Sequence, residues 1–539
     1  MKGKILVAPL GQDVHVAGIN KFSKIAEKLD YEVIFLGPGI GTDGIVNAII
    51  NYNPDIVGVS YRLTPETAIS EVRDFIEAVK IKGLYNKQYV LAGTEPVLDA
   101  VREFGFFDEY FASGDSGKVL RYLKGDLGEP EEVVFGNTLR ERIEANYPFP
   151  IIRHHLGLPT MEQTLDAVRE IAESETVDVV SIAPDQTAQE SFFHPERHDP
   201  KTAGAGGVPI RSENDLMAIY EASRTGNYPL LRIYAGTNDF IKLAELYDRT
   251  INNAWAAIPL FWFNHMDGRG PLSVEDSIKE HQELMKWYGD RDLFVEPLEA
   301  HHWSLRDAHD TISVLGAYLG ALNAAKQGVD DIILQCMMHT PVGTSTKMDL
   351  AKMLAKKELI EEIPDISLLV QTRTGLLSYP ADMSEAKAHL AHSVGLQMYL
   401  NPDIVHVVSY SEAHHASTSK DIVDSCKMAR FVISQSLDSL PDISSDPEIL
   451  QRKDSLKNDV RYIIDHSIET FGSSYDDLSN PEFLSKMIES GIMDTPQLLK
   501  NYYAMGTVRT RMVNGACVPV DDNDEMITEK ERLNGLVIK

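Results

Sequence analysis

The sequence predicts an α/β protein with two domains, a doubly wound parallel sheet at the N-terminus followed by a (β/α)8 barrel. Short apolar runs alternate with amphipathic segments along most of the chain, which is the pattern of buried parallel strands joined by helices. A charged, proline-bounded stretch at residues 126–150 interrupts this alternation and indicates a linker. The length of 539 residues suits two or three domains.

The first predicted domain covers residues 1–125. Four apolar runs are expected to be its strands: Lys4–Pro9, Val33–Leu36, Asp55–Ser60 and Tyr89–Ala92. The segments between them, such as Ala17–Leu29 and Thr67–Ile81, have the spacing of amphipathic helices. This order of elements predicts a doubly wound, flavodoxin-like sheet.

The second predicted domain covers residues 151–440. Seven strand-like runs recur there, separated by longer helical segments, at 177–183, 229–236, 257–263, 293–297, 331–335, 368–372 and 404–410. An eighth strand is expected near Pro148–Ile152, which completes the count of a (β/α)8, or TIM, barrel. Residues 441–539 are more polar, and we expect a C-terminal helical region that ends in an irregular tail from residue 504.

Composition excludes several classes of partner. The net charge is −30, and such a surface repels phosphate backbones, so we expect no nucleic acid partner. We expect no signal peptide and no membrane span, which favours a cytoplasmic protein. Cys336, Cys426 and Cys517 lack metal-ligand spacing and are expected to be free thiols. The sequence is compatible with a homodimer but does not determine the oligomeric state.

A polar loop after the first predicted strand carries the strongest functional signal. It contains Asp13, His15 and Gly18 and lies at the carboxyl edge of the sheet, where ligands of this fold bind. A carboxylate that accepts one ring N–H of a histidine raises the basicity of the other ring nitrogen. Gly18 leaves room for a bulky ligand. The alternative is a response-regulator-like domain with a solvated histidine in this loop.

Two further loops, after the third and fourth predicted strands, extend the pattern that begins with this loop. Ser60–Glu66 follows the third predicted strand, and Ala92–Pro96 follows the fourth. In this order, the three loops resemble the cobalamin-binding domain of methionine synthase and the adenosylcobalamin mutases, over residues 1–125. The resemblance implies that His15 coordinates cobalt. It also implies that a cobalamin tail enters a crevice formed by Ser60, Thr64, Gly93 and Thr94.

The chain departs from this family at two positions. Arg62 stands where the family has a leucine, and Ala92 replaces the first glycine of a Gly-Gly pair. The change at Arg62 alters the expected packing around the tail, whereas the change at Ala92 is mild.

The barrel sequence resembles the large subunit of glutamate mutase (methylaspartate mutase). The matching segments follow one another in the family's order, from a Pro-x-x-Arg stretch near the first strand, through Gly236–Asp239 and Ser411–Ala413, to Gly491–Pro496. The resemblance implies that Glu412 holds the adenosyl ribose. It places five further residues at the substrate site: Arg153, Asp185, Gln189, Tyr234 and Glu296.

The expected substrate shell differs from that of the family, which binds two carboxylates with three arginines. Only Arg153 matches without an alignment gap. Gln189 stands at the second position, and the third is Tyr234, or Arg232 if a gap is placed differently. Val408 replaces the lysine that precedes the ribose-binding glutamate. We therefore expect a small carboxylate substrate with fewer charges than glutamate.

Histidines are frequent near the expected strand ends of the barrel, at His265, His301, His302, His339, His414 and His415. We expect them to form hydrogen bonds or transfer protons; the alternative is a second metal site. Arg306 and Arg373 are each suited to an anion or a nearby carboxylate, and the sequence does not separate the two.

Together these features predict an adenosylcobalamin-dependent isomerase (mutase) that performs a radical 1,2-rearrangement. A methylcobalamin-dependent methyltransferase is the main alternative. Its corrinoid domain normally carries a helical cap, for which the first strand at Lys4 leaves no room. A non-enzymatic cobalamin-binding protein is the third possibility.

Overall fold

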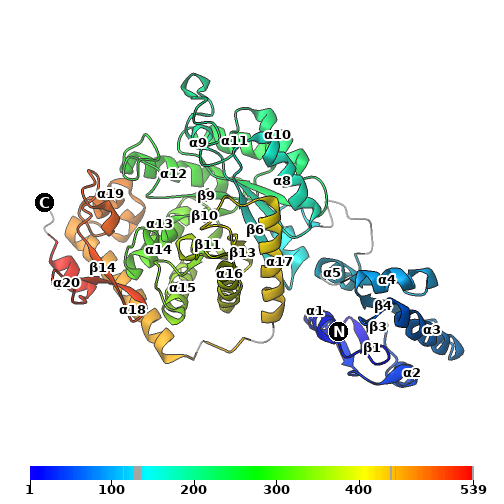
Figure 1. The fold of residues 1–539 in the computed structure, drawn as a ribbon. Helices are drawn as coiled ribbons and strands as arrows, with labels where there is room; N and C mark the ends of the chain where they lie inside the picture. Colours follow the sequence, from blue (N-terminus) through cyan, green and yellow to red (C-terminus); the bar gives the residue numbers. More distant parts are fainter. Residues whose placement is uncertain (113–114, 127–134, 438–439, 444, 537–539) are drawn as a thin grey trace. The chain divides into compact units, whose positions relative to one another are not determined.

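The computed structural model describes residues 1–112, 115–126, 135–437, 440–443 and 445–536 (Figure 1). The chain forms two compact units, Met1–Glu129 with Asn146–Phe149, and Pro130–Ala145 with Pro150–Lys539. Part of the expected linker, residues 127–134, lies outside the described residues. Helix α7 (Leu139–Asn146) lies in its described part, and nearly all of this helix belongs to the second unit.

A five-stranded parallel sheet organises the first unit. Its strands are β1 (Gly3–Pro9), β2 (Tyr31–Phe35), β3 (Ile56–Tyr61), β4 (Gln88–Gly93) and β5 (Glu109–Ala112). They pair in the order β2-β1-β3-β4-β5, which is the flavodoxin-like order predicted from the sequence. The order reverses between β1 and β3, so the loops after these two strands open a crevice at the carboxyl edge. Strand β5 was missed because it is short and only partly buried.

Helices cover both faces of this sheet. They are α1 (Ala17–Lys28), α2 (Gly41–Tyr52), α3 (Pro65–Ile81), α4 (Glu95–Val101) and α5 (Ser116–Lys124), with a 3-10 turn at Arg102–Phe104. The Thr64 side chain accepts the amide of Thr67 and Pro65 occupies the first turn, so α3 begins directly after the loop of β3. Two hydrophobic clusters, one containing Leu6 and Phe75 and the other Ile5 and Phe22, bury the strands.

The second unit contains eight parallel strands. They are β6 (Ile151–Leu156), β7 (Val179–Ile182), β8 (Leu230–Ile233), β9 (Ala256–Ile258), β10 (Val295–Pro297), β11 (Asp331–Met338), β12 (Ser367–Thr374) and β13 (Ile404–Val407). They pair in the order β8-β7-β6-β13-β12-β11-β10-β9. The amide of Ala254, just before β9, donates to the carbonyl of Leu231 in β8 at 2.9 Å, so the two ends of the sheet nearly close. The predicted fold class is confirmed.

Helices follow the strands around the outside of the barrel. They are α8 (Met161–Glu173), α9 (Gln186–Ser191), α10 (Glu213–Ala222), α11 (Phe240–Ile251), α12 (Val274–Gly289), α13 (Glu299–Ser304), α14 (Asp310–Lys326), α15 (Thr346–Glu361), α16 (Met383–Gln397) and α17 (Ser419–Ser436). The expected eighth strand begins at Ile151 rather than Pro148, because Tyr147–Phe149 belongs to the loop that enters it.

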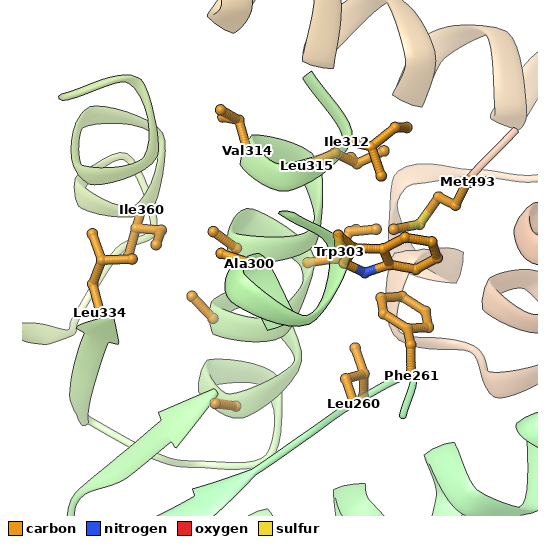
Figure 2. Packing of buried hydrophobic residues seen from close by; sticks show 14 of the residues in the cluster. Leu260, Phe261, Ala300, Trp303, Ile312, Val314, Leu315, Leu334, Ile360 and Met493 are labelled. Atoms are coloured by element: carbon orange, nitrogen blue, oxygen red, sulfur yellow. The ribbon is translucent and has the colours of Figure 1, made fainter. Parts of the chain in front are cut away.

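The C-terminal region shares its core with the barrel. It contains α18 (Pro447–Phe471), α19 (Pro481–Glu489), β14 (Arg509–Val513), β15 (Ala516–Val520) and α20 (Glu529–Asn534). Figure 2 shows the Trp303 indole of α13 between Phe261 and Met493, and Met493 comes from the segment after α19. The expectation of an irregular tail is wrong, because β14 and β15 form an antiparallel hairpin whose second strand is fully buried. Within the described residues, no helix has the length and apolarity needed to cross a membrane.

Candidate functional site

The loop between β1 and α1 holds His15 in a fixed orientation. The Asp13 side chain is fully buried, and its Oδ1 lies 2.6 Å from His15 Nδ1 and accepts the His15 backbone amide at 2.9 Å. Its Oδ2 accepts the backbone amide of Arg62, in the loop after β3, at 2.6 Å. Because the carboxylate occupies Nδ1, the proton lies on that nitrogen and Nε2 keeps its lone pair for a metal. About half of the His15 side chain remains exposed.

A crevice of about 800 Å³ opens beside this loop. Its walls are mostly apolar and come from both loops and from β4, β5, α1 and α5: Val7, His15, Gly18, Ile19, Lys21, Phe22, Ile25, Gly58, Val59, Ser60, Arg62, Val90, Ala92, Gly93, Phe111, Ala112, Asp115, Ser116 and Val119. Within the described part of the chain, the buried Ser60 Oγ has no hydrogen-bond partner. A Cβ at Gly93 would lie 2.9 Å from the Tyr61 carbonyl oxygen, so only glycine fits there.

The crevice brings together His15, Gly18, Ser60 and Gly93, four of the residues expected to bind the cofactor. Asp13 lies behind His15, whereas Thr64 and Thr94 are the N-cap residues of α3 and α4 and do not line the crevice. The sequence did not predict β5, so it also did not predict the crevice residues that come from β5 and α5. A histidine with a free ring nitrogen, an apolar cleft and an unpartnered hydroxyl fit a cobalt corrinoid with a buried tail.

A second cavity, of about 540 Å³, lies at the carboxyl ends of the barrel strands. It is lined by Arg153, His155, Gln189, Arg232, Tyr234, Phe263, Arg269, Glu296, Leu298, His301, His302, Gln335 and Arg373. Four of the five predicted substrate-site residues are among them: Arg153, Gln189, Tyr234 and Glu296.

Asp185 does not line the cavity, so the structure does not place it with the other predicted site residues. It is buried at the N-terminus of α9, where its Oδ1 accepts the Ala188 amide at 2.9 Å. Its Oδ2 lies 2.5 Å from Arg211 Nη2 and also accepts the Gly204 amide. The carboxylate therefore anchors the loop between β7 and α10. The position of Asp185 at a strand end in the sequence does not distinguish an anchor of the loop from a substrate-binding residue.

Glu296 is the centre of a buried network in the cavity floor. Its Oε2 accepts from Trp255 Nε1 at 2.7 Å and lies 3.3 Å from both Arg153 Nη1 and Arg232 Nη2. Its Oε1 accepts from the Gln371 amide at 2.8 Å. One carboxylate therefore serves two guanidinium groups.

Four arginines line the cavity, whereas the sequence matched only Arg153 to the family's arginines without an alignment gap. Arg232 and Arg373 are buried like Arg153, and Arg269 is about half exposed. The strand register decides this, because the side chains of β8 and β12 alternate between the barrel interior and the helices. The reason to expect a substrate less charged than glutamate is therefore lost.

Histidines in the cavity wall are neutral. Burial holds the pKa values of His155, His301 and His302 well below the ordinary value, and nearby arginines lower them further. His155 Nε2 lies 2.8 Å from Arg153 Nη2 and therefore accepts from the guanidinium. His155 was not among the histidines singled out in the sequence.

The other predicted histidines lie elsewhere. His265 packs against Tyr503, His339 against His389, and His414 and His415 lie in an exposed loop. Among the described residues, no three His, Cys, Asp or Glu side chains are arranged to hold a metal. Glu412 lies in the same exposed loop after β13 and does not line the cavity.

Known proteins match the first unit. A family model described as a B12 binding domain matches residues 3–118. A corrinoid protein of Desulfitobacterium hafniense (strain Y51) is 34% identical over 95 residues, which is 18% of this chain and 43% of that protein. Residues 3–118 form a B12-binding domain.

A solved structure is also similar to part of the chain. A cobalamin-binding protein from Desulfitobacterium hafniense DCB-2 is 30% identical to the chain, with a TM-score of 0.19, over 20% of this chain and 51% of that one. The chain thus spans about half the length of these relatives, or less.

Two other structures align over more of the chain. The carboxyl transferase domain of Rhizobium etli pyruvate carboxylase is 11% identical, with a TM-score of 0.30, over 67% of this chain and 65% of that one. The cobalamin-dependent S-adenosylmethionine radical enzyme OxsB is 10% identical, with a TM-score of 0.19, over 90% and 83%. At these values the similarity carries no functional information.

Proposed function

We propose that the protein is an adenosylcobalamin-dependent isomerase (mutase) that performs a radical 1,2-rearrangement on a small carboxylate substrate. The observation that carries the proposal is the cavity at the carboxyl ends of the barrel strands, whose wall holds four arginines and one carboxylate. Guanidinium groups recognise carboxylates through paired hydrogen bonds, so this wall favours an anionic substrate. The B12-binding domain of the same chain supports the choice of cofactor.

The residues that would hold the cofactor fit this proposal. His15 would coordinate the cobalt through Nε2, with its ring oriented by Asp13. Gly18, Ser60 and Gly93 would line the crevice of the tail. Thr64 caps α3 beside it, and Thr94 lies at the start of α4. Glu412 would hold the adenosyl ribose. When bound, adenosylcobalamin supplies a cobalt–carbon bond that breaks homolytically.

The barrel residues would bind and orient the substrate. Arg153 and Glu296 form a rigid floor, because their polar atoms are held by other side chains. Gln189 donates its amide to the Pro184 carbonyl at 2.9 Å, which leaves Oε1 to accept from a hydroxyl or amine. Tyr234 offers its hydroxyl beside His155. The buried floor of the cavity would also keep water away from reactive carbon radicals.

The experiment uses the full chain with adenosylcobalamin and a panel of small hydroxy, branched, amino and dicarboxylic acids. We expect the correct compound to produce a coupled cob(II)alamin–organic radical signal in electron paramagnetic resonance. His15→Ala is the matched variant and should weaken this signal. Transfer of a methyl group from a donor to the bound corrinoid, without a radical under any condition, would instead establish the methyltransferase. Tight binding without either reaction would indicate a non-enzymatic cobalamin-binding protein.

A further inference from the structure

The buried arginines of the barrel cavity differ in how they are partnered. Arg153 is saturated, because its Nε donates to Ser181 Oγ at 2.7 Å, its Nη1 to Gln371 Oε1 at 2.7 Å, and its Nη2 to His155. Its charge is also balanced by Glu296. Arg153 therefore has little hydrogen-bonding capacity left for a ligand.

Arg373 is in the opposite state. It lies near the end of β12, in register with His406 of β13 and Met337 of β11, and only 8% of it is exposed. Its Nε is buried without a partner, and no ion pair or hydrogen bond joins its guanidinium to any residue that the structure describes. Glu412 acts on Arg373 through space but forms no ion pair with it.

Arg232 adds a second unused donor edge. Only its Nη2 reaches Glu296, whereas its Nε and Nη1 are buried without partners among the described atoms. The Tyr234 ring lies 5.0 Å from the Arg232 guanidinium and covers one of its faces. Three buried arginines face a single glutamate, so two positive charges lack a counterion in the cavity wall.

A buried guanidinium without a counterion is costly, and unlike a lysine or a histidine it does not lose its proton to relieve the cost. Proteins keep such groups where a ligand supplies the opposite charge. We propose that Arg373, together with the free edge of Arg232, binds the carboxylate of the substrate, while Arg153 positions the cavity floor. The identification of the anion as a substrate rests on the proposed function; the anion site itself rests on the two arginines.

The test measures anion binding by the full chain loaded with hydroxocobalamin. The probes are succinate, propionate, inorganic phosphate and the neutral propionamide. Binding of each probe is measured by calorimetric titration and by the shift in the melting temperature of the protein. We expect a carboxylate to bind and to raise the melting temperature, and propionamide to do neither. Arg373→Gln should weaken carboxylate binding about 10-fold to 100-fold, and Arg373→Lys should restore part of it. Binding of phosphate alone would overturn the assignment to a carboxylate.

A second readout separates binding from a structural role. Without any anion, Arg373→Gln should melt at or above the temperature of the wild-type protein, because it removes an uncompensated charge. A structural role predicts a lower melting temperature. Arg249→Gln is the matched control, since Arg249 is exposed and paired with Glu213 outside the cavity. Carboxylate affinity unchanged in Arg373→Gln, or no carboxylate binding by the wild-type protein, would overturn the proposal.

The two proposals fail separately. Carboxylate binding that depends on Arg373, without a radical for any acid in the panel, would refute the isomerase and leave the anion site intact. A radical that forms at the same substrate concentration in Arg373→Gln and in the wild-type protein would refute the role of Arg373 and leave the isomerase intact.

Discussion

The Nδ1 atom of His15 lies 2.6 Å from Oδ1 of Asp13, and the same carboxylate binds the backbone of the loop after β3 through Oδ2. One buried side chain thus joins the two loops between which the order of the sheet reverses. The two loops together therefore fix the orientation of the His15 ring, and with it the direction of its free Nε2 atom. This arrangement makes the orientation of His15 the first property to test.

His15→Ala should remove the nitrogen splitting from the electron paramagnetic resonance spectrum of the chain loaded with cob(II)alamin. Isotopic labelling of histidine nitrogen should change that splitting in the wild-type protein. Asp13→Asn should keep the splitting but weaken corrinoid binding by about 10-fold to 100-fold, because it loses the charge that orients the ring. A splitting that persists in His15→Ala would show that another group coordinates the cobalt.

Arg153→Met should destabilise the protein strongly. It removes the donor to Ser181 Oγ, Gln371 Oε1 and His155 Nε2, and each buried polar group left without a partner costs about 1–3 kcal/mol. Denaturant unfolding at neutral pH measures the change in the free energy of unfolding. The surface variant Arg249→Met should cost less than about 1 kcal/mol. If Arg153→Met unfolds like the wild-type protein, Arg153 does not support the cavity floor.

Glu412→Ala should lower the affinity for adenosylcobalamin and leave the affinity for methylcobalamin nearly constant. The reason is that the ribose of the adenosyl group is absent from methylcobalamin, which carries a methyl group in its place. Glu412 lies in an exposed loop, so the substitution should not unfold the barrel. Equal losses for the two cobalamins, measured by titration of the full chain, would show that Glu412 acts on the structure of the loop instead.

Lys356→Met should stabilise the protein at neutral pH, with an advantage that shrinks as the pH rises. Lys356 is 1% exposed on α15, and burial, followed by repulsion from Lys352, lowers its pKa to about 7. The unfolded chain keeps this proton up to the ordinary value of 10.5, so the wild-type protein gains stability between pH 7 and that value. The difference between variant and wild type should fall by about 1.4 kcal/mol per pH unit there. A difference independent of pH in denaturant unfolding would contradict the lowered pKa.

The sequence by itself determined the fold class and the loop of His15. Buried parallel strands appear as continuous apolar runs, and Asp13 and His15 interact across only two residues, so both features are local. The short strand β5 was missed because its partly buried residues form no such run.

Only the tertiary structure decided the composition of the barrel cavity. Arg153, Arg232, Glu296 and Arg373 come from four strands that are far apart in the sequence, and the barrel register turns all of them inward. If the register moved by one residue, these side chains would face the surrounding helices instead of the barrel interior. Asp185, which the sequence placed at a strand end with the others, instead anchors a loop through Arg211. The distances between strands decide which charges are paired and which remain for a ligand. No local pattern of residues in the sequence predicts these distances.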